Sequence, residues 1–291
     1  MQNAWILRIL LLLTITVGCY SASLGQYFID VLSANAQVHR STPNEGGFEQ
    51  TGVNTWTNLF VPVVRPSGNT LIVRASAEQL TLTNESTSLR LRSLTLPLGV
   101  QWKSKNPKWR HTTLIIPKIA GASNLTLNDR GQLGLYWLSQ YSFSDSLRVK
   151  VGLYINREFF GNLYVPMLGL DWKVNSRWNL YGTLPNSFRC AYSIRPGVLN
   201  TGVGFKSMVR SFRASNAQEY IRYNEIQVKY FLEWIIAKKW VAFCEMGYFM
   251  GKAPLLYQNN AAKSDFQNSD LLKVMRPFPL LNIGAAWRVF Q

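Results

Sequence analysis

The chain has 291 residues and a formal net charge of +16, with 31 lysines and arginines against 15 aspartates and glutamates. Hydrophobic residues make up 47% and charged residues 16%, whereas disordered chains are poor in hydrophobic residues and rich in charge, so disorder is excluded. Two histidines and three cysteines leave little material for a zinc framework or a disulfide scaffold.

The N-terminal residues predict a secretory signal peptide over 1–25. Arg8 precedes a short apolar run that ends at Val17, and small residues follow as far as Gly25. This order of positive charge, apolar run and small residues is typical of a cleaved export signal. The run is shorter than the ~20 apolar residues that a membrane-spanning helix needs. Cys19 leaves a second interpretation open, in which the chain is a lipoprotein.

The mature chain, 26–291, is predicted to be a single domain of β-strands. Apolar residues occupy every second position of 147–155, and the positions between them include Arg148 and Lys150. A period of two residues is typical of a strand with one apolar face. The same period runs over 281–289 near the C-terminus.

The whole pattern gives about fourteen antiparallel strands, within a range of about twelve to fourteen. They fall near 28–39, 50–63, 70–83, 88–103, 109–120, 131–143, 146–157, 163–174, 177–184, 187–195, 198–213, 222–235, 239–250 and 275–290. The strand over 88–103 changes its apolar phase once, which predicts a β-bulge near Arg92 and Ser93. The segment 222–235 also fits one apolar face of a helix.

The predicted connections alternate between short turns and longer loops. Short links follow the even-numbered strands, at 65–69, 104–108, 144–145, 175–176, 196–197 and 236–238. Longer links follow several odd-numbered strands, at 40–49, 121–130, 214–221 and 251–274. Short turns at one end and long loops at the other are the plan of an outer-membrane β-barrel, and an even strand number returns both termini to the short-turn end.

Tryptophans gather beside the short turns. Seven of them flank these turns or the C-terminus: Trp102, Trp109, Trp172, Trp178, Trp234, Trp240 and Trp287. An indole ring prefers the membrane–water interface, where its apolar body and its N–H are both accommodated. These residues therefore predict an aromatic girdle at one rim of a barrel.

Charged residues on the second face of the strands are candidates to line a lumen. They are Arg148, Lys150, Lys229, Glu233 and Arg288. In a membrane barrel the inward face meets water while the outward face meets lipid, so charges alternate with apolar residues. In a water-soluble β-sandwich, which is the alternative fold, the same charges would form the outer surface.

The C-terminal residues match an insertion signal of bacterial outer-membrane barrels. The signal has a polar residue, then glycine, then two apolar positions, and Asn282, Gly284, Trp287 and Val289 fit it. Such a signal implies the barrel assembly machinery as a partner. Barrels usually end on an aromatic residue, whereas Phe290 is penultimate here.

The segment from Gly169 to Pro185 carries a wider resemblance. It has the pattern of a hairpin of two strands followed by Leu184-Pro185. With this segment, nearly the whole mature chain resembles an uncharacterised family of outer-membrane barrels from Bacteroidetes-type Gram-negative bacteria. The resemblance implies a barrel in the outer membrane, and it implies no activity and no catalytic residues.

The sequence predicts a protein that is not an enzyme, with no catalytic, cofactor-binding or metal site. A lipid-acting enzyme of the Ser-His type would rest on His39 or His111, the only two histidines. The motifs of an esterase elbow, a zinc protease and a phosphate-binding loop are absent from the sequence. Cys190 and Cys244 fall in strands roughly 15 Å apart, beyond the ~7 Å that a disulfide allows, so we expect two free, lipid-facing thiols.

The positive charge is spread along the chain without a basic run, which argues against nucleic acid as a partner. Basic rims suit the anionic headgroups of outer-membrane lipid and lipopolysaccharide, and a solvated surface without a ligand is the alternative. We expect first a passive pore or small-solute transporter with a basic lumen. Second is a non-conducting structural or binding barrel with 251–274 as plug or contact loop, and third is an outer-membrane lipid-acting enzyme.

Overall fold

The computed structural model describes residues 28–41, 50–66, 68–83, 88–122, 127–214, 218–251, 255–258 and 278–290. The predicted signal peptide over 1–25, with Cys19, lies outside the described residues. No helix in the described part of the chain is long and apolar enough to cross a membrane.

The chain forms strands almost throughout. They are β1 (Phe28–Ser41), β2 (Gln50–Val64), β3 (Thr70–Thr83), β4 (Ser88–Thr95), β5 (Leu98–Lys103), β6 (Trp109–Gly121), β7 (Gly131–Ser142), β8 (Leu147–Glu158), β9 (Gly161–Lys173), β10 (Trp178–Leu184), β11 (Ser187–Arg195), β12 (Leu199–Arg213), β13 (Glu219–Ile236), β14 (Trp240–Gly251), β15 (Leu255–Gln258) and β16 (Phe278–Phe290). One short helix, α2 (Leu127–Arg130), precedes β7.

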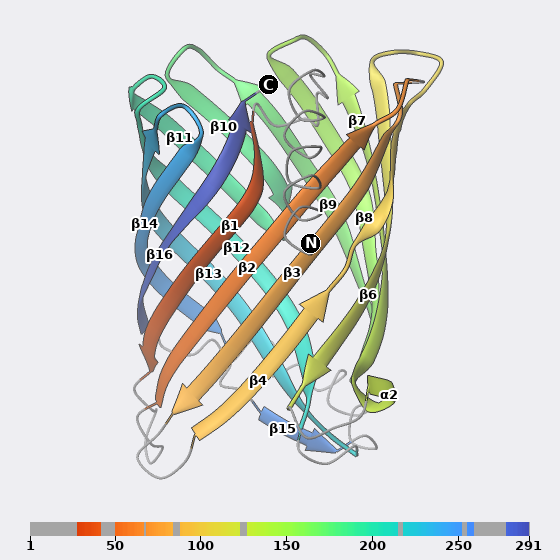
Figure 1. Cartoon of the computed structure of the whole chain (residues 1–291), viewed down its shortest axis with the longest axis vertical. Coiled ribbons are helices and arrows are strands. Elements are labelled where there is room, and N and C mark those ends of the chain that lie inside the picture. Colours follow the sequence, from red (N-terminus) through yellow and green to blue (C-terminus); the bar gives the residue numbers. More distant parts are fainter. Residues whose placement is uncertain are drawn as a thin grey trace, which may run out of the picture.

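Antiparallel pairing between neighbours closes these strands into a barrel (Figure 1). β4 and β5 occupy one position in the wall and β15 lies outside it, so the wall has 14 strands. The seam joins β1 to β16, with Phe28 opposite Phe290. β1 therefore begins, and β16 ends, at the end of the barrel that carries the short turns, the end that faces the periplasm in outer-membrane barrels.

The outer wall is apolar and the interior is polar, which places the barrel in the outer membrane. Four apolar side chains project outward from the wall strand that β4 and β5 form together, at every second residue. They are Leu94, Leu96, Leu98 and Val100, and all four are exposed. A water-soluble protein rarely exposes a continuous apolar surface of this extent, so this wall contacts lipid. The alternative of a soluble β-sandwich is therefore wrong.

The predicted bulge near Arg92 and Ser93 is wrong. The register between β3 and β4 is regular from Thr83 opposite Ser88 to Ser76 opposite Thr95, and it continues into β5 without a shift. Side chains keep alternating, and the apolar face changes sides instead. On the short-turn side of this point apolar residues face lipid, whereas on the long-loop side Leu91 points into the barrel and Arg92 points outward.

The segment that also fitted a helix is a strand. β13 extends from Glu219 to Ile236, and its burial alternates from Ile221 to its end. The sequence did not predict β15. This strand lies inside the connection expected over 251–274, and it pairs with the beginning of β13. Residues 259–277 of that connection lie outside the described residues, so its expected role as a plug or contact loop stays a prediction.

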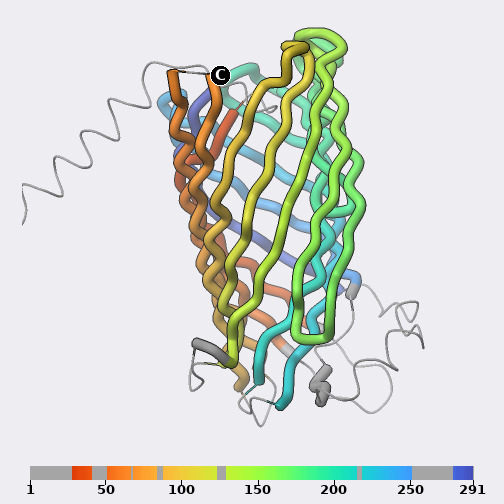
Figure 2. The backbone as a smooth tube through the Cα atoms, turned by 90° about the vertical axis from the view of Figure 1, so that its right-hand side faces the viewer, coloured from red at the N-terminus to blue at the C-terminus, as the bar shows by residue number. Residues whose placement is uncertain are grey.

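The wall is least continuous between β9 and β12, because the hairpin β10–β11 between them is short. β9 pairs with β10 only up to Leu168, and β12 pairs with β11 only up to Lys206. Pro166, which has no backbone N–H to offer, lies on the unpaired part of β9, as is usual for an edge strand. Figure 2 views the barrel from the side of β6–β8 and shows the tilted strands of the far wall behind them.

The C-terminal end of β12, at the long-loop end of the barrel, forms hydrogen bonds with β8 and with the residue that follows β6. The Ser211 backbone N–H donates to Glu158 Oε2 on β8 at 2.8 Å. The Ala122 N–H, at the end of β6, donates to the Arg213 carbonyl at 3.0 Å. β12 stays paired with β13 as far as Arg213, and its last residues reach across the long-loop end of the barrel to β8 and β6.

Cys190 on β11 and Cys244 on β14 are free thiols on the outward, lipid-facing side of their strands. With the protein in lipid vesicles, we expect a lipid-soluble maleimide to modify both thiols and a charged thiol reagent to modify neither. Mass spectrometry of the modified protein measures this. Rapid reaction of either thiol with the charged reagent would place it in the water-filled interior and contradict the orientation of its strand.

Candidate functional site in the barrel interior

The structure places the five charged residues singled out by sequence on the inward face, and most of them are paired. Lys150 Nζ lies 2.5 Å from Asp171 Oδ1, and Lys229 forms an ion pair with Glu245. Arg288 joins Asp30 (2.6 Å) and Glu233 (3.1 Å), which ties the two strands of the seam to β13. Arg148 lies opposite Asp171 in the register of β8 and β9.

Sequence reasoning missed the two arginines that organise the interior. Arg189 on β11 bonds to both Glu233 (2.7 Å) and Glu245. Arg210 on β12 bonds to both Glu78 and Glu225 (2.5 Å for the second). Both arginines occupy inward positions of alternating strands, so the same period that selected Arg148 selects them as well. The pairs neutralise much of the positive charge that the sequence assigns to the lumen.

A cluster of apolar side chains, here the mouth cluster, closes the interior at the long-loop end. Its members are Leu80, Leu82, Leu91, Ala120, Phe212, Ala214, Ile221, Tyr223, Phe249, Phe278 and Leu280. They come from β3, β4 and β6 on one wall and from β12 to β16 on the other, apart from Ala214 just after β12. They meet because the last residues of β12 reach across the long-loop end of the barrel. Arg210 spans the same gap to Glu78 on β3.

The remaining gap beside the mouth cluster is filled by polar contacts. Gln132 Nε2 on β7 donates to the Ser211 carbonyl at 3.1 Å. Glu158 accepts from the Ser211 hydroxyl at 2.6 Å and lies 3.5 Å from Lys118 Nζ. The mouth cluster and these polar contacts together pack the interior on both sides of β12 at the long-loop end.

Part of the interior between the mouth cluster and the short turns is accessible to solvent. Arg74 points inward from the middle of β3 and is exposed, so water reaches it within the barrel. Among the described residues it forms no ion pair. A cavity of about 200 Å³ beside Arg189 and Arg288 lies nearer the short turns. Sequence reasoning missed Arg74, although it alternates with apolar residues on a predicted strand.

Neither histidine belongs to a Ser-His-acid triad among the described residues. His39 is buried in the barrel, with its ring stacked on Phe249 at 5.1 Å. His111 lies on the outward face, where its Nδ1 is 2.8 Å from Ser139 Oγ. Ser139 is only 4% exposed, so a substrate does not reach its hydroxyl. In the described part of the chain, His111 has no carboxylate partner that would orient it as in a catalytic triad.

No group of histidine, cysteine or acidic residues within the described ranges is arranged to hold a metal ion.

The predicted girdle tryptophans lie at the short-turn ends of their strands. Trp240 and Trp287 are directly opposite each other across β14 and β16. Trp102 and Trp109 flank the outward ring of His111, at 5.5 and 6.0 Å. The insertion-signal residues Asn282, Gly284, Trp287 and Val289 all lie on β16 and pair with β1.

A closed barrel with an apolar outer wall and a charged interior defines the protein as an outer-membrane β-barrel. No protein-family model matches the sequence, and no curated protein matches it. Among solved structures, an outer-membrane channel from Pseudomonas putida is similar over 93% of this chain and 100% of its own, with 10% identity and a TM-score of 0.47. The TodX monoaromatic hydrocarbon channel gives coverages of 91% and 90%, 9% identity and a TM-score of 0.45.

The outer membrane phospholipase A of Escherichia coli is similar over 90% of this chain and 97% of its own, with 9% identity and a TM-score of 0.40. At such identities and TM-scores, a channel and an enzyme resemble the chain about equally. The function must therefore be argued from the residues of the barrel itself.

Proposed function

We propose that the protein is a gated outer-membrane pore for small anionic solutes, with its closed state set by the mouth cluster. The observation that carries the proposal is Arg74, an inward arginine that is exposed to water and has no ion pair among the described residues. A cation that stays unpaired on the wall of an aqueous lumen attracts anions and repels cations. Most other inward charges hold each other and are unavailable to a passing solute.

The charge pattern favours a conduit over a solid structural barrel. A barrel with only a structural role gains nothing from a hydrated arginine at mid-height, because a buried apolar core would stabilise it better. The packed long-loop end and the solvent-accessible space around Arg74 together suit a vestibule with one barrier. Opening needs only the displacement of the side chains that meet at β12.

Replacement of Arg74 by glutamate tests the proposal. The change converts the free positive charge of the lumen to a negative one, so we expect the anion-to-cation permeability ratio to fall by roughly tenfold. The reversal potential of open steps in a planar bilayer, under a salt gradient, measures the ratio. The matched control is Arg65→Glu, which makes the same charge change at an exposed position in a short turn. Equal ratios in wild type and R74E would overturn the assignment of Arg74.

The second candidate is a non-conducting barrel, and the closure of the mouth by described residues favours it. Absence of current from folded, inserted protein, even after the mouth cluster is loosened, would support it.

The third candidate is a lipid-acting enzyme, and it has the pair of His111 and Ser139 in its favour. Loss of phospholipid hydrolysis in S139A protein would be needed to support it. Membership of the Bacteroidetes-type family is a proposal that rests on the segment from Gly169 to Pro185.

A further inference from the structure

Three of the short turns have a tryptophan at each end. The turns after β5, β9 and β13 lie between Trp102 and Trp109, between Trp172 and Trp178, and between Trp234 and Trp240. Their basic residues are Lys103, Lys105, Lys108, Lys173, Arg177, Lys238 and Lys239, and they contain no acidic residue. The other short turns, over 65–69, 143–146 and 195–198, hold one charged residue each: Arg65, Asp145 and Arg195. Positive charge at this end of the barrel therefore gathers beside the tryptophans.

The turns after β5 and β9 share a local motif. They end in Asn106-Pro107-Lys108-Trp109 and in Asn175-Ser176-Arg177-Trp178. In both, the asparagine side-chain oxygen accepts from the backbone N–H of the basic residue, at 3.0 Å for Lys108 and 2.8 Å for Arg177. Each turn thus fixes a cation directly before an outward tryptophan of the girdle.

The turn after β13 holds a lysine in a backbone conformation that lysine rarely adopts. Ala237 and Lys238 have φ values of 50° and 60°, and the Lys239 N–H donates to the Ile236 carbonyl at 3.2 Å. Positive φ at both central residues defines a type I′ turn, in which glycine, asparagine and aspartate predominate. The turn therefore carries a cation where the backbone favours a smaller, uncharged residue.

Six of these cations are free to meet a ligand, and they are here called the cation ring. They are Lys103, Lys105, Lys108, Arg177, Lys238 and Lys239; all are exposed, and none forms an ion pair with a described residue. Lys173 has interactions of its own and is not counted. Arg177 NH1 donates to the Tyr192 hydroxyl at 3.0 Å, and the Tyr192 ring packs against Trp178 at 4.9 Å.

The tryptophans set the depth of the cation ring in the membrane. Indole rings lie at the membrane–water interface, so the residue next to each of them toward the turn is level with the lipid headgroups. Lysine and arginine at this level pack their apolar stems near the interface and extend the charge outward. The short-turn end faces the periplasm, so the headgroups are those of the periplasmic leaflet, whereas lipopolysaccharide lies in the opposite leaflet.

We propose that the cation ring binds the phosphate groups of anionic phospholipids in the periplasmic leaflet of the outer membrane. The three turns are separated along the rim by the turns after β7 and β11, so the cations are spread around the barrel. A layer of lipid meets such a ring on all sides, whereas a soluble acidic protein would need the charges on one side. The inference goes beyond the pore, and it holds whether or not the barrel conducts.

Site-specific photo-cross-linking in vesicles tests the proposal. The exposed Ser176, beside Arg177, is replaced by the photoreactive residue benzoylphenylalanine. The folded protein is irradiated in vesicles of equal parts phosphatidylglycerol and phosphatidylcholine, and mass spectrometry counts the lipid adducts. We expect about five adducts of phosphatidylglycerol for each one of phosphatidylcholine, the factor for one cation near an anionic membrane surface. Concentrated salt should bring this ratio close to one.

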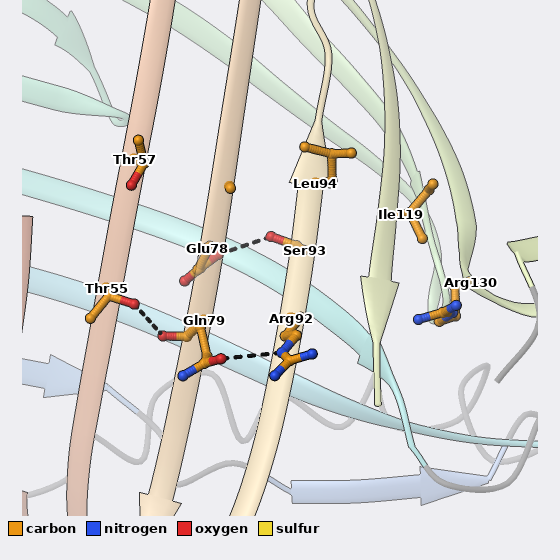
Figure 3. Close-up of a pocket in the computed structure, with 10 residues that line it drawn as sticks. Thr55, Thr57, Glu78, Gln79, Arg92, Ser93, Leu94, Ile119 and Arg130 are labelled. Atoms are coloured by element: carbon orange, nitrogen blue, oxygen red, sulfur yellow. Dashed lines mark hydrogen bonds between the residues drawn. The ribbon is translucent and has the colours of Figure 1, made fainter. Parts of the chain in front are cut away.

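The variant K108Q/R177Q/K239Q removes one cation from each of the three turns and should lower the adduct ratio below about twofold. The matched control R90Q/R92Q/R157Q removes three exposed cations near the long-loop end and should keep the ratio of the parent protein. Arg92 lies there on the outer wall, with its Nε bonded to Gln79 Oε1 at 3.1 Å (Figure 3). R65Q, at a short turn without tryptophan, is a second control at the same end of the barrel.

Equal adducts of the two lipids in the parent protein would overturn the proposal, and so would a ratio that K108Q/R177Q/K239Q leaves unchanged. Loss of the preference when inorganic phosphate is added at the concentration of the lipid would overturn the assignment to a lipid. Displacement of the adducts by a soluble polyglutamate peptide would assign the ring to an acidic protein instead. The heat-dependent shift in gel migration shows that each variant is folded; if the triple variant is not, R177Q replaces it under the same criteria.

Discussion

Replacement of Phe212 and Phe249 by alanine is expected to turn a mostly closed barrel into one that conducts for much of the time. Phe212 is fully buried in the mouth cluster, and Phe249 stacks on Phe278 at 4.6 Å. Each Phe→Ala change removes about 3–5 kcal/mol of packing from a closed core. An open mouth has lost these contacts already, so the balance shifts toward opening by about a hundredfold or more.

The fraction of time that single channels spend open in a planar bilayer measures this shift. The matched control is F143A/F205A, because Phe143 is an exposed turn residue and Phe205 lies on the outward face of the same strand β12. We expect the control to behave as wild type. Large, stable open steps in wild type that F212A/F249A leaves unchanged would show that the mouth cluster does not close the barrel.

Replacement of Arg210 by alanine is expected to destabilise the barrel by about 3–5 kcal/mol, because two buried carboxylates lose the cation that they share. Arg210 is 3% exposed and lies between Glu78 and Glu225, which come from opposite walls. Its removal therefore also loosens the contact across the lumen. Urea-induced unfolding from lipid vesicles measures the free energy of unfolding.

A second variant separates the loss of the arginine from the repulsion that it leaves behind. The triple variant R210M/E78Q/E225Q removes all three charges and keeps most of the volume, so it should recover much of the lost stability. Arg65→Ala, at an exposed turn, should change the free energy of unfolding by no more than about 0.5 kcal/mol. A loss in R210A as small as in R65A would mean that the ion pairs contribute little.

The barrel itself was predictable from the sequence, because a strand in the wall of a membrane barrel alternates between lipid-facing apolar residues and inward-facing polar residues. Alternation along Leu147–Glu158 predicts the strand and the inward direction of Lys150. The tryptophans beside the short turns identify one interface without any knowledge of the pairing. The same reasoning failed at Arg92, where the chain leaves the apolar band and the outward face becomes polar without a change in backbone phase.

The closed mouth was not predictable, because it depends on contacts between opposite walls. Alternation places Ser211 in a strand, and it does not show that the end of β12 contacts Glu158 on β8. The ion-pair partners of the lumen charges were likewise not predictable from the sequence. Lys150 was selected by its period, whereas Asp171 becomes its partner only through the register of β8 with β9.

The seam between β1 and β16 sets an order on folding. Asp30 bonds to Arg288 across 258 positions of the chain, and Asn35 to Asn282 across 247. A contact of such sequence separation forms late and slowly, because a long loop must be closed first. Until β16 is in place, β1 and β14 are both open edges that can pair with another chain. A chain that lacks its last strand is therefore expected to aggregate through two edges, and a complete chain must be kept apart from its neighbours until its two ends meet.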